Sequence, residues 1–352
     1  MQSTVLPRAL TLEQQNALAH AIQANVPFVS RPFAEIGEAL GVSEAAVLEQ
    51  ISAWKSEGKL REVSAILEGS TLGYDSALVA GEVPEDRLDE VAEAVNAHPT
   101  VTHNYLRNHD YNLWFTIAVP SEMGLERTLR VLATRAGVRE FFPLRRTHTF
   151  KVGVNFDLLS KTSTTTAVQL EEPVPLELSA GDAALFRAIQ TPLAIVERPF
   201  AALAARAGVS ETELLGFSRR HLGNAMRRYV ATFNHRKLGV QGNGMVVWRV
   251  PSSELSRLGP LLAQAPEVSH CYARNSIPGF DYTLYSMLHG PSDDACREVA
   301  GGLAERLGLA DYLILFSSRE YKKCRLRYFL PELEAWWSAN ASALPSCGDA
   351  KL

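Results

Sequence analysis

The sequence has few cysteines and no excess of basic residues. Its four cysteines all lie in the second half of the 352 residues and none forms a C-x-x-C pair, so neither a disulfide framework nor a zinc ribbon is indicated. The formal net charge is -4, which gives no general basic surface for nucleic acid or anionic lipid. We therefore expect a reduced, cytoplasmic protein.

Long apolar segments are also missing. No apolar stretch reaches the roughly 18 residues of a transmembrane helix, and the N-terminal run MQSTVLPRALTLEQQ lacks the apolar core of a secretory signal. The composition is otherwise ordinary, with 46% hydrophobic and 21% charged residues, which excludes a wholly disordered chain. Because the length exceeds what one core usually needs, we expect two or more domains.

The chain contains an internal duplication. Three motifs recur 167 residues later: RPF at 31–33 and 198–200, GVS at 41–43 and 208–210, and V-x-H-x-Y-x-R at 101–107 and 268–274. The pair DY at 110–111 then recurs at 281–282, a separation of 171 residues, which places a four-residue insertion near 276–279. Chance identities would not keep one separation over so long a span, so we predict two homologous copies.

Each copy begins with a pattern typical of a helix-turn-helix. Thr11-x-x-Gln14 is a capping box that opens a helix, and a second helix follows Arg31-Pro32 and ends at Gly41. Ser43 caps a third helix, and Ser210-x-x-Glu213 forms a full capping box at the equivalent place in the second copy. Helix, helix, Gly-Val-Ser turn and helix is the spacing of a helix-turn-helix.

An α+β segment follows in each copy. In the first copy we expect strands at 63–67 and 77–83, a helix at 85–97, strands at 100–107 and 111–119, a helix at 121–135 and a strand at 139–150. The fold class is therefore α+β, a tandem duplication of a winged helix-turn-helix and a ferredoxin-like sheet. The expected domains are helix-turn-helix 10–60, sheet 61–157, linker 158–178, helix-turn-helix 179–226, sheet 227–335 and tail 336–352.

This architecture resembles the Lrp/AsnC family of amino-acid-responsive regulators, which makes DNA binding the first hypothesis. Charge argues against it, because residues 31–68 carry four basic and seven acidic side chains, and Glu44 and Glu49 lie in the first turns of the expected recognition helix. Residues 198–237 instead carry eight basic and two acidic side chains. A solvated basic face is the ordinary explanation, but the asymmetry between copies favours one anionic small molecule over a symmetric operator.

The duplicated strand motif places polar side chains on one face. Because strand side chains alternate, His103, Tyr105 and Arg107 share a face, and the second copy repeats them at His270, Tyr272 and Arg274. We expect these residues to converge across a pseudo-two-fold axis. They could be inert interface residues, but the identical spacing in both copies favours function. The second copy has no counterpart of His109, so either both copies build one site or only one copy works.

Three segments carry a resemblance to a known family. They are HNYLRNHDYNLWFT at 103–116, RPFAEIGEALGVS at 31–43 and EYKKCRLRYF at 320–329. They resemble the siroheme decarboxylases, which are Lrp/AsnC-like enzymes of haem d1 and alternative haem biosynthesis, and the resemblance runs from about Arg31 to Phe329. Members of this family usually occur as paired subunits, and a chain with both copies resembles the fused form.

The resemblance implies a carboxy-lyase acting on siroheme, an iron tetrapyrrole with eight carboxylates. The family removes the acetate carboxyls at C12 and C18 and forms 12,18-didecarboxysiroheme and two molecules of carbon dioxide. No additional cofactor is implied, because the iron belongs to the substrate. The implied partners are siroheme and either a second copy or other decarboxylase subunits of the haem d1 pathway, with neither DNA nor a membrane.

Decarboxylation of a pyrrole acetate requires a proton donor, for which histidine is the natural choice. We predict His103 and His109 as catalytic acids, Arg107 as the residue that orients the reacting carboxylate, and Tyr111 as a hydrogen-bond partner. His270 or His103 could instead ligate the iron, and no other metal site is predicted. The predicted substrate-binding residues are Arg145, Arg146, His148, Arg219, Arg220, Arg227, Arg228, His235, Arg236, His270, Arg274 and Lys322.

Two other functions are compatible with the same sequence. A regulator or sensor would use the fold to bind haem or an amino acid and, weakly, DNA. A partner subunit would be inactive alone. Outside the site, we expect Trp336 and Trp337 to anchor a helix by packing.

Overall fold

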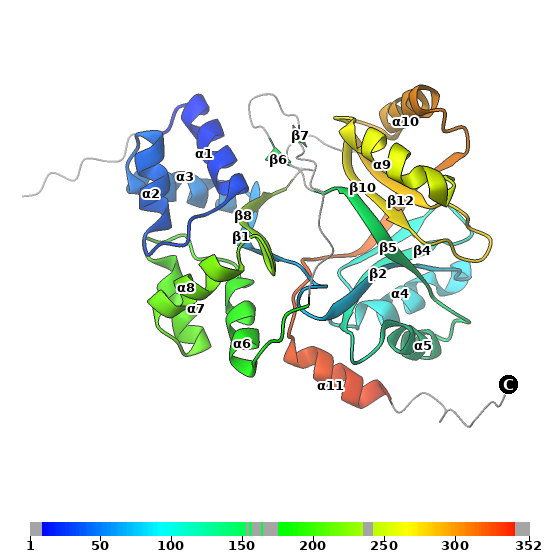
Figure 1. The fold of residues 1–352 in the computed structure, drawn as a ribbon, viewed down its shortest axis with the longest axis horizontal. Helices are drawn as coiled ribbons and strands as arrows, with labels where there is room; N and C mark the ends of the chain where they lie inside the picture. The colour runs from blue at the N-terminus through cyan, green and yellow to red at the C-terminus, as the bar shows by residue number, and fades with distance from the viewer. Residues whose placement is uncertain (1–8, 153–154, 157–162, 165–174, 235–241, 342–352) are drawn as a thin grey trace, which may run out of the picture. The chain divides into compact units, whose positions relative to one another are not determined.

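The computed structural model describes residues 9–152, 155–156, 163–164, 175–234 and 242–341 (Figure 1). The chain divides into two compact units. One contains the helix-turn-helix segments of both copies, and the other contains the sheets of both copies. No helix in the described ranges is both long and apolar enough to cross a membrane.

The helix-turn-helix unit contains three helices from each copy. They are α1 (Leu12–Ala24), α2 (Pro32–Leu40), α3 (Glu44–Ser56), α6 (Ala180–Ile189), α7 (Pro199–Ala207) and α8 (Glu211–His221). The capping box of Thr11 is confirmed, and Gly41 and Gly208 end α2 and α7 in the left-handed region, with φ of 66° and 74°. Ser43 and Ser210 cap α3 and α8, each accepting a backbone N–H bond.

Strand pairing joins the two helix-turn-helix copies. Strand β1 (Leu60–Leu67) pairs antiparallel with β8 (Met226–Phe233) of the other copy, with Val63 opposite Ala231. Trp54 of α3 packs edge-on against Phe233, with ring centroids 5.5 Å apart. Each copy therefore completes the small sheet of the other, and neither helix-turn-helix stands alone.

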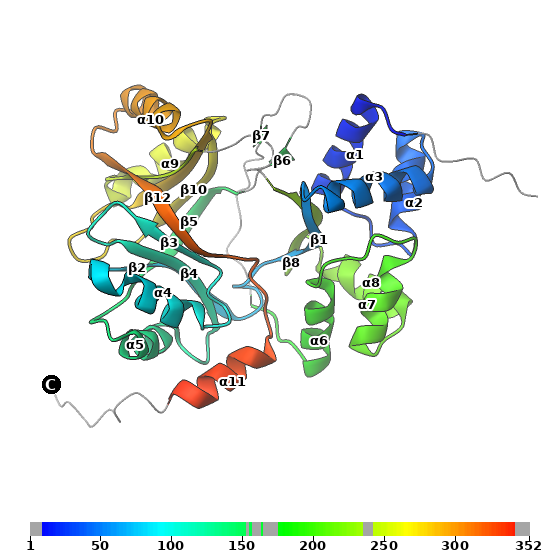
Figure 2. The ribbon, with the colours of Figure 1, turned by 180° about the vertical axis from the view of Figure 1, so that it is seen from behind.

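The other unit is built on a closed eight-stranded barrel. Its strands are β2 (Tyr74–Gly81), β3 (His103–Arg107), β4 (Leu113–Pro120), β5 (Phe142–Lys151), β9 (Gly242–Trp248), β10 (Val268–Arg274), β11 (Leu284–Gly290) and β12 (Tyr312–Lys323). Their order is β10-β11-β9-β12-β3-β4-β2-β5. The two four-stranded sheets therefore join through the pairs β12–β3 and β5–β10, and Figure 2 shows β12 beside β3.

Helices cover the outside of the barrel, and a separate apolar core fills its inside. The remaining elements are η1 (Glu85–Arg87), α4 (Leu88–Asn96), α5 (Leu125–Ala136), β6 (Asn155–Phe156), β7 (Ser163–Thr164), η3 (Ser252–Glu254), α9 (Leu255–Gln264), α10 (Asp293–Leu307) and α11 (Pro331–Asn340). Side chains of β4 alternate as strands require. Phe115 packs in the core beneath α4 and α5, whereas Trp114 packs inside the barrel with Leu144 and Leu315.

Strand directions fix which residues share an end of the barrel. All neighbouring strands are antiparallel, so β3 and β10, four steps apart around the ring, run the same way. His103 and His270 therefore lie at one end, which we call the histidine end. The loops 108–112 and 275–283 lie at the opposite end, the hairpin end. The interior core separates the two ends.

Candidate active site

The first copy builds an ordered row of polar side chains from the histidine end inward. His103 Nδ1 lies 3.1 Å from Thr102 Oγ1, and the His103 and Tyr105 ring centroids are 6.1 Å apart. The Arg107 guanidinium lies 5.4 Å from the centroid of the Tyr105 ring, a cation–π contact. Strand alternation therefore holds all three predicted residues on one face.

The second copy repeats this row in detail. His270 Nδ1 lies 3.1 Å from Ser269 Oγ, and the His270 and Tyr272 centroids are 6.2 Å apart. Arg274 lies 5.4 Å from the Tyr272 centroid and 5.6 Å from that of Tyr285. The structure thus places the two predicted rows on strands of one barrel that run the same way, with both histidines near one end and both arginines at the last strand residue.

Both arginines have a buried guanidinium nitrogen without a partner among the described residues, Arg107 as a buried residue and Arg274 as a half-buried one. Arg107 Nη1 donates to the Leu315 carbonyl at 2.5 Å, and Arg274 Nη1 donates to the equivalent Leu144 carbonyl at 2.8 Å. The Nε of each guanidinium is buried without a partner in the described chain. Burial lowers the pKa of Arg107 to about 10 and lowers the pKa of Arg274, which Arg146 lowers further. A buried cation of this kind favours an anionic ligand.

Two other predicted residues near Arg274 lie on β5. Arg146 is opposite Arg274 in the β10–β5 pairing, and His148 is opposite Ala273. Both side chains are exposed, and His148 stacks on Phe150 with ring centroids 6.0 Å apart. Arg146 therefore adds positive charge close to the buried Arg274.

Two predicted substrate-binding cations already have protein partners. Lys322 Nζ donates to the Asn96 and His98 carbonyls, at 2.7 and 3.3 Å, where α4 ends. Burial lowers the pKa of this ammonium. Arg145 pairs instead with Glu126 of α5 at 2.6 Å. The structure therefore uses both cations to attach helices to the sheet, and any contact with substrate stays a prediction.

The arginine-rich segment of the second copy belongs to the other compact unit. Arg219 Nη1 donates to the Phe28 carbonyl at 2.6 Å, and Arg227 forms a short ion pair with the largely buried Glu68. Arg220 is exposed at the end of α8, and Arg228 lies on β8. His235 and Arg236 lie outside the described residues. The structure thus shows structural roles for two of these arginines.

Carboxylates occupy the start of both expected recognition helices. Glu44, the first residue of α3, forms a short ion pair with Arg31, and Glu211 forms the same pair with Arg198 at the start of α8. Glu197 also lies 3.2 Å from Arg31. Acidic groups at these positions would repel a phosphate backbone, so the charge argument from the sequence agrees with this geometry.

His109 lies at the hairpin end, away from His103. The Tyr111 backbone N–H donates to His109 Nδ1 at 3.0 Å, so the proton of the neutral ring is on Nε2. Burial lowers the pKa of His109, and Asp110 opposes this shift. The four-residue insertion of the second copy covers this loop, since Tyr111 Oη donates to the Pro278 carbonyl at 2.6 Å.

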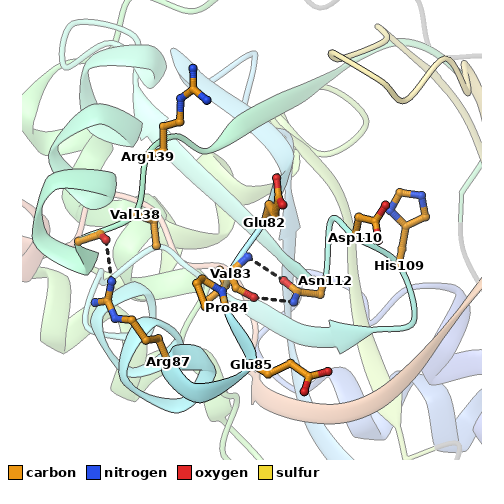
Figure 3. A pocket seen from close by; sticks show the side chains of 11 residues that line it. Glu82, Val83, Pro84, Glu85, Arg87, His109, Asp110, Asn112, Val138 and Arg139 are labelled. Carbon is orange, nitrogen blue, oxygen red and sulfur yellow. Dashed lines mark hydrogen bonds between the residues drawn. The ribbon is translucent and has the colours of Figure 1, made fainter.

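A cavity of about 580 Å³ opens beside His109 (Figure 3). Its lining includes the acidic Glu82, Glu85 and Asp110. Arg87 also lines it but is engaged, with a bond to the Gly137 carbonyl at 2.7 Å and a pair with Glu90 at 3.0 Å. A substrate with many carboxylates would be repelled by this lining.

The predicted catalytic pair is therefore separated. His103 begins β3, whereas His109 lies in the loop after Arg107, the last residue of that strand; the strand from His103 to Arg107 alone spans about 13 Å at about 3.3 Å per residue. Trp114 and its neighbours in the interior core lie between the two ends. The two histidines cannot contact one acetate group together.

Sequence reasoning missed two residues that position the rows. Thr102 and Ser269 each lie within hydrogen-bond distance of one ring nitrogen of the following histidine. Tyr105 and Tyr272 were predicted on the shared face, but their cation–π contacts with the arginines were not. The hydroxyl residues directly precede the histidines of the duplicated motif, so the signal was present.

The chain was compared with known families and structures. Residues 71–151 and 237–322 match the AsnC-like ligand binding domain, and residues 15–61 and 182–222 match the siroheme decarboxylase NirDL-like HTH domain. The chain is 38% identical to a siroheme decarboxylase of Hydrogenobacter thermophilus, over 92% of this chain and 97% of that protein. It is 36% identical to a siroheme decarboxylase NirDL subunit of Paracoccus pantotrophus, over 87% and 94% of the two chains.

A solved structure matches over the same extent. The crystal structure of the siroheme decarboxylase NirDL in complex with an iron-uroporphyrin III analogue has a TM-score of 0.77 and 33% identity, covering 94% of this chain and all of that one. The similarity includes both copies, both domain types and the order in which they occur. The chain belongs to the siroheme decarboxylase family.

Proposed function

We propose that this chain is the enzyme that decarboxylates siroheme in haem d1 biosynthesis. It removes the acetate carboxyls at C12 and C18, and it forms 12,18-didecarboxysiroheme and two molecules of carbon dioxide. The iron is part of the substrate, and the reaction uses no further cofactor. Because one chain supplies both copies of the barrel, the proposal includes activity without another subunit.

The observation that carries the proposal is the pair of polar rows that start at the histidine end and run along β3 and β10. Each row has a histidine outside and a buried, incompletely bonded arginine further in. Carboxylates are the natural ligands of guanidinium groups, and a buried cation gains most from such a partner. The complex of the related NirDL enzyme with an iron-uroporphyrin III analogue supports a tetrapyrrole ligand.

The proposed reaction needs one proton for each acetate. The bond between the methylene carbon and the carboxylate breaks, and the electron pair stays on the methylene carbon, which is conjugated with the pyrrole. An imidazolium proton from His103 converts this carbon to a methyl group, and carbon dioxide leaves. Arg107, which ends β3, orients the substrate through a second carboxylate, and solvent returns the proton to His103. The reaction requires neither oxidant nor reductant.

His270 is the natural candidate for the second acetate. It repeats His103 in its neighbouring hydroxyl, tyrosine and arginine, and it lies at the same end of the barrel. Ligation of the siroheme iron is the alternative role for this residue. The absorption spectrum of siroheme bound to His270→Ala separates the two, since loss of an axial imidazole changes the spectrum and loss of an acid does not.

The hairpin end is a poorer place for this substrate. The cavity beside His109 has three acidic side chains in its lining, and one of its two arginines is already paired. We therefore assign His109 and Tyr111 to the support of the hairpin, where Phe280 packs edge-on against His109 at 5.1 Å.

The test is anaerobic incubation of the purified chain with siroheme, followed by mass spectrometry of the tetrapyrrole. We expect a product that has lost two carbon dioxide masses. Loss of one mass would contradict activity at two acetates. Binding without any mass loss would favour the sensor or the inactive subunit, and absence of binding would contradict the substrate assignment.

A further inference from the structure

The chain that follows β12 borders the histidine end, and we call its residues 324–330 the strap. Figure 2 shows this segment leading from β12 to α11. At its start, Lys323 is opposite His103 in the β12–β3 pairing. The backbone N–H of Cys324 then donates to the Thr102 carbonyl at 2.8 Å. The strap thus begins directly beside the predicted catalytic histidine.

The other end of the strap is attached to β2. The backbone N–H of Phe329 donates to Tyr74 Oη at 2.8 Å, and the buried Tyr328 packs edge-on against the Tyr74 ring at 4.9 Å. Tyr74 is the first residue of β2. Strands β2 and β3 both pair antiparallel with β4, so they run in the same direction and both begin at the histidine end. The strap therefore follows this end from β3 to β2.

Phe329 is held in an unfavourable backbone conformation. Its φ of 56° is in the left-handed region, which bulky residues rarely adopt, and no other non-glycine residue of the described ranges has a positive φ. The Tyr74 hydroxyl bond and an edge-on contact between the two rings at 5.6 Å hold it there. Strain of this kind persists where the surrounding structure imposes a particular path on the chain.

The strap carries an arginine that no group of the described chain binds. Arg327 lies between the two attachment points and is exposed. Within the described residues it makes no hydrogen bond or ion pair, in contrast to Lys322, which is bonded to the end of α4. The conformation of the strap is therefore not explained by a structural role for this guanidinium.

We propose that Arg327 binds a peripheral carboxylate of the tetrapyrrole, and that the strap holds it at the histidine end for this purpose. This inference rests on the proposed function. Arg327 thereby determines specificity, favouring tetrapyrroles with many peripheral carboxylates over those with few. Its guanidinium matches a carboxylate in two parallel hydrogen bonds, which a strap attached at both ends can present in a fixed position.

The test measures dissociation constants for two iron porphyrins by absorbance titration of the full chain. Iron-uroporphyrin III carries eight carboxylates, and iron protoporphyrin IX carries two. For Arg327→Gln we expect about fivefold weaker binding of iron-uroporphyrin III, a shallower salt dependence and unchanged binding of iron protoporphyrin IX. Arg327→Lys should recover part of the loss. Arg306→Gln on α10 removes an exposed charge away from the strap and is the matched control.

Three results would overturn the inference. Equal affinities of Arg327→Gln and Arg306→Gln for iron-uroporphyrin III would show that Arg327 binds no carboxylate. An equal loss for both porphyrins would show that the substitution acts through the shape of the strap. If the unsubstituted chain bound neither porphyrin, the proposed function would fail together with this inference.

Discussion

At the scale of single residues, two histidines of the first copy are held neutral by their surroundings. His98 is fully buried, and its Nδ1 accepts the Thr100 backbone N–H at 3.3 Å. Burial, assisted by Lys322, lowers the pKa of His98 to about 3. His109 is half-buried, and burial lowers its pKa as well. The buried His98 affects the free energy of unfolding, and His109 affects the charge of the hairpin end.

His98 should make stability depend on pH. In the unfolded chain it binds a proton below about pH 6.5, whereas in the folded chain it does so only near pH 3, so stability is lost as the pH falls between these values. Between pH 7 and pH 5 we expect His98 to account for about 2 kcal/mol of lost stability. Urea unfolding of the unsubstituted chain and of His98→Phe at both pH values measures this.

The exposed His148→Gln is the matched control for that comparison. It should retain the pH dependence of the unsubstituted chain, while His98→Phe should lose about 2 kcal/mol less on acidification. If both variants had the same pH dependence as the unsubstituted chain, the burial of His98 would not be the cause.

His109 should titrate below the usual range. Its Nδ1 accepts the Tyr111 N–H, so we expect the neutral Nε2–H tautomer at pH 7. Nitrogen-15 NMR of labelled histidine gives both the pKa and the tautomer. A pKa above about 6.5, or a proton on Nδ1, would contradict the geometry of the hairpin end.

At the scale of elements, α11 packs against the core of the first copy with both of its tryptophans. Trp336 lies in the core beneath α4 and α5, and its ring packs edge-on against His98 at 4.3 Å. The predicted packing role of this helix is confirmed. The helix continues to Asn340, so the tail boundary expected at 336 falls inside it.

Removal of this side chain should be costly. We expect Trp336→Ala to lower the free energy of unfolding by about 3 kcal/mol or more, because it leaves a cavity in the core. Trp337→Ala should cost less, since that ring is half-buried and stacks on Arg127 at 4.8 Å. Urea unfolding of both variants measures the difference, and equal losses would show that α11 is not anchored through Trp336.

Elements with local signals were predictable from the sequence. Thr11 and Ser43 mark helix starts, Gly41 marks a helix end, and alternation set the face shared by His103 and Arg107. Partners distant in the sequence carry no such signal. Glu68 could not be assigned to Arg227 from its position, and pairing across the copies joins segments that no local pattern connects.

In the candidate site, too, the features with a local sequence signal were predictable and the long-range contacts were not. The repeated motif identified both polar rows, since spacing and alternation are local properties. The separation of His103 from His109 depends on where β3 ends and its loop turns, which no local pattern fixes. The carbonyl partners of the arginines, Leu315 and Leu144, depend on barrel closure and could not be predicted.

At the scale of the whole molecule, each copy supplies half of one barrel. The first copy alone would leave the edges of β3 and β5 unpaired, and the second would leave β10 and β12 unpaired. Unpaired edges of this length promote association. We therefore expect the separately expressed copies to aggregate or self-associate, and co-expression to give a soluble one-to-one complex, as measured by light scattering. Soluble monomers of either copy would contradict a shared barrel.

The assignment of catalysis to the histidine end is tested most directly by single-turnover decarboxylation of bound siroheme by His103→Ala and His109→Ala. The affinity of each variant for siroheme is first shown to equal that of the unsubstituted chain. We predict that His103→Ala slows the loss of one of the two carbon dioxide molecules by at least about 100-fold, as expected for removal of a general acid, and that His109→Ala stays within a few-fold for both. The account is contradicted if His109→Ala is the slow variant, or if His103→Ala retains the full rate.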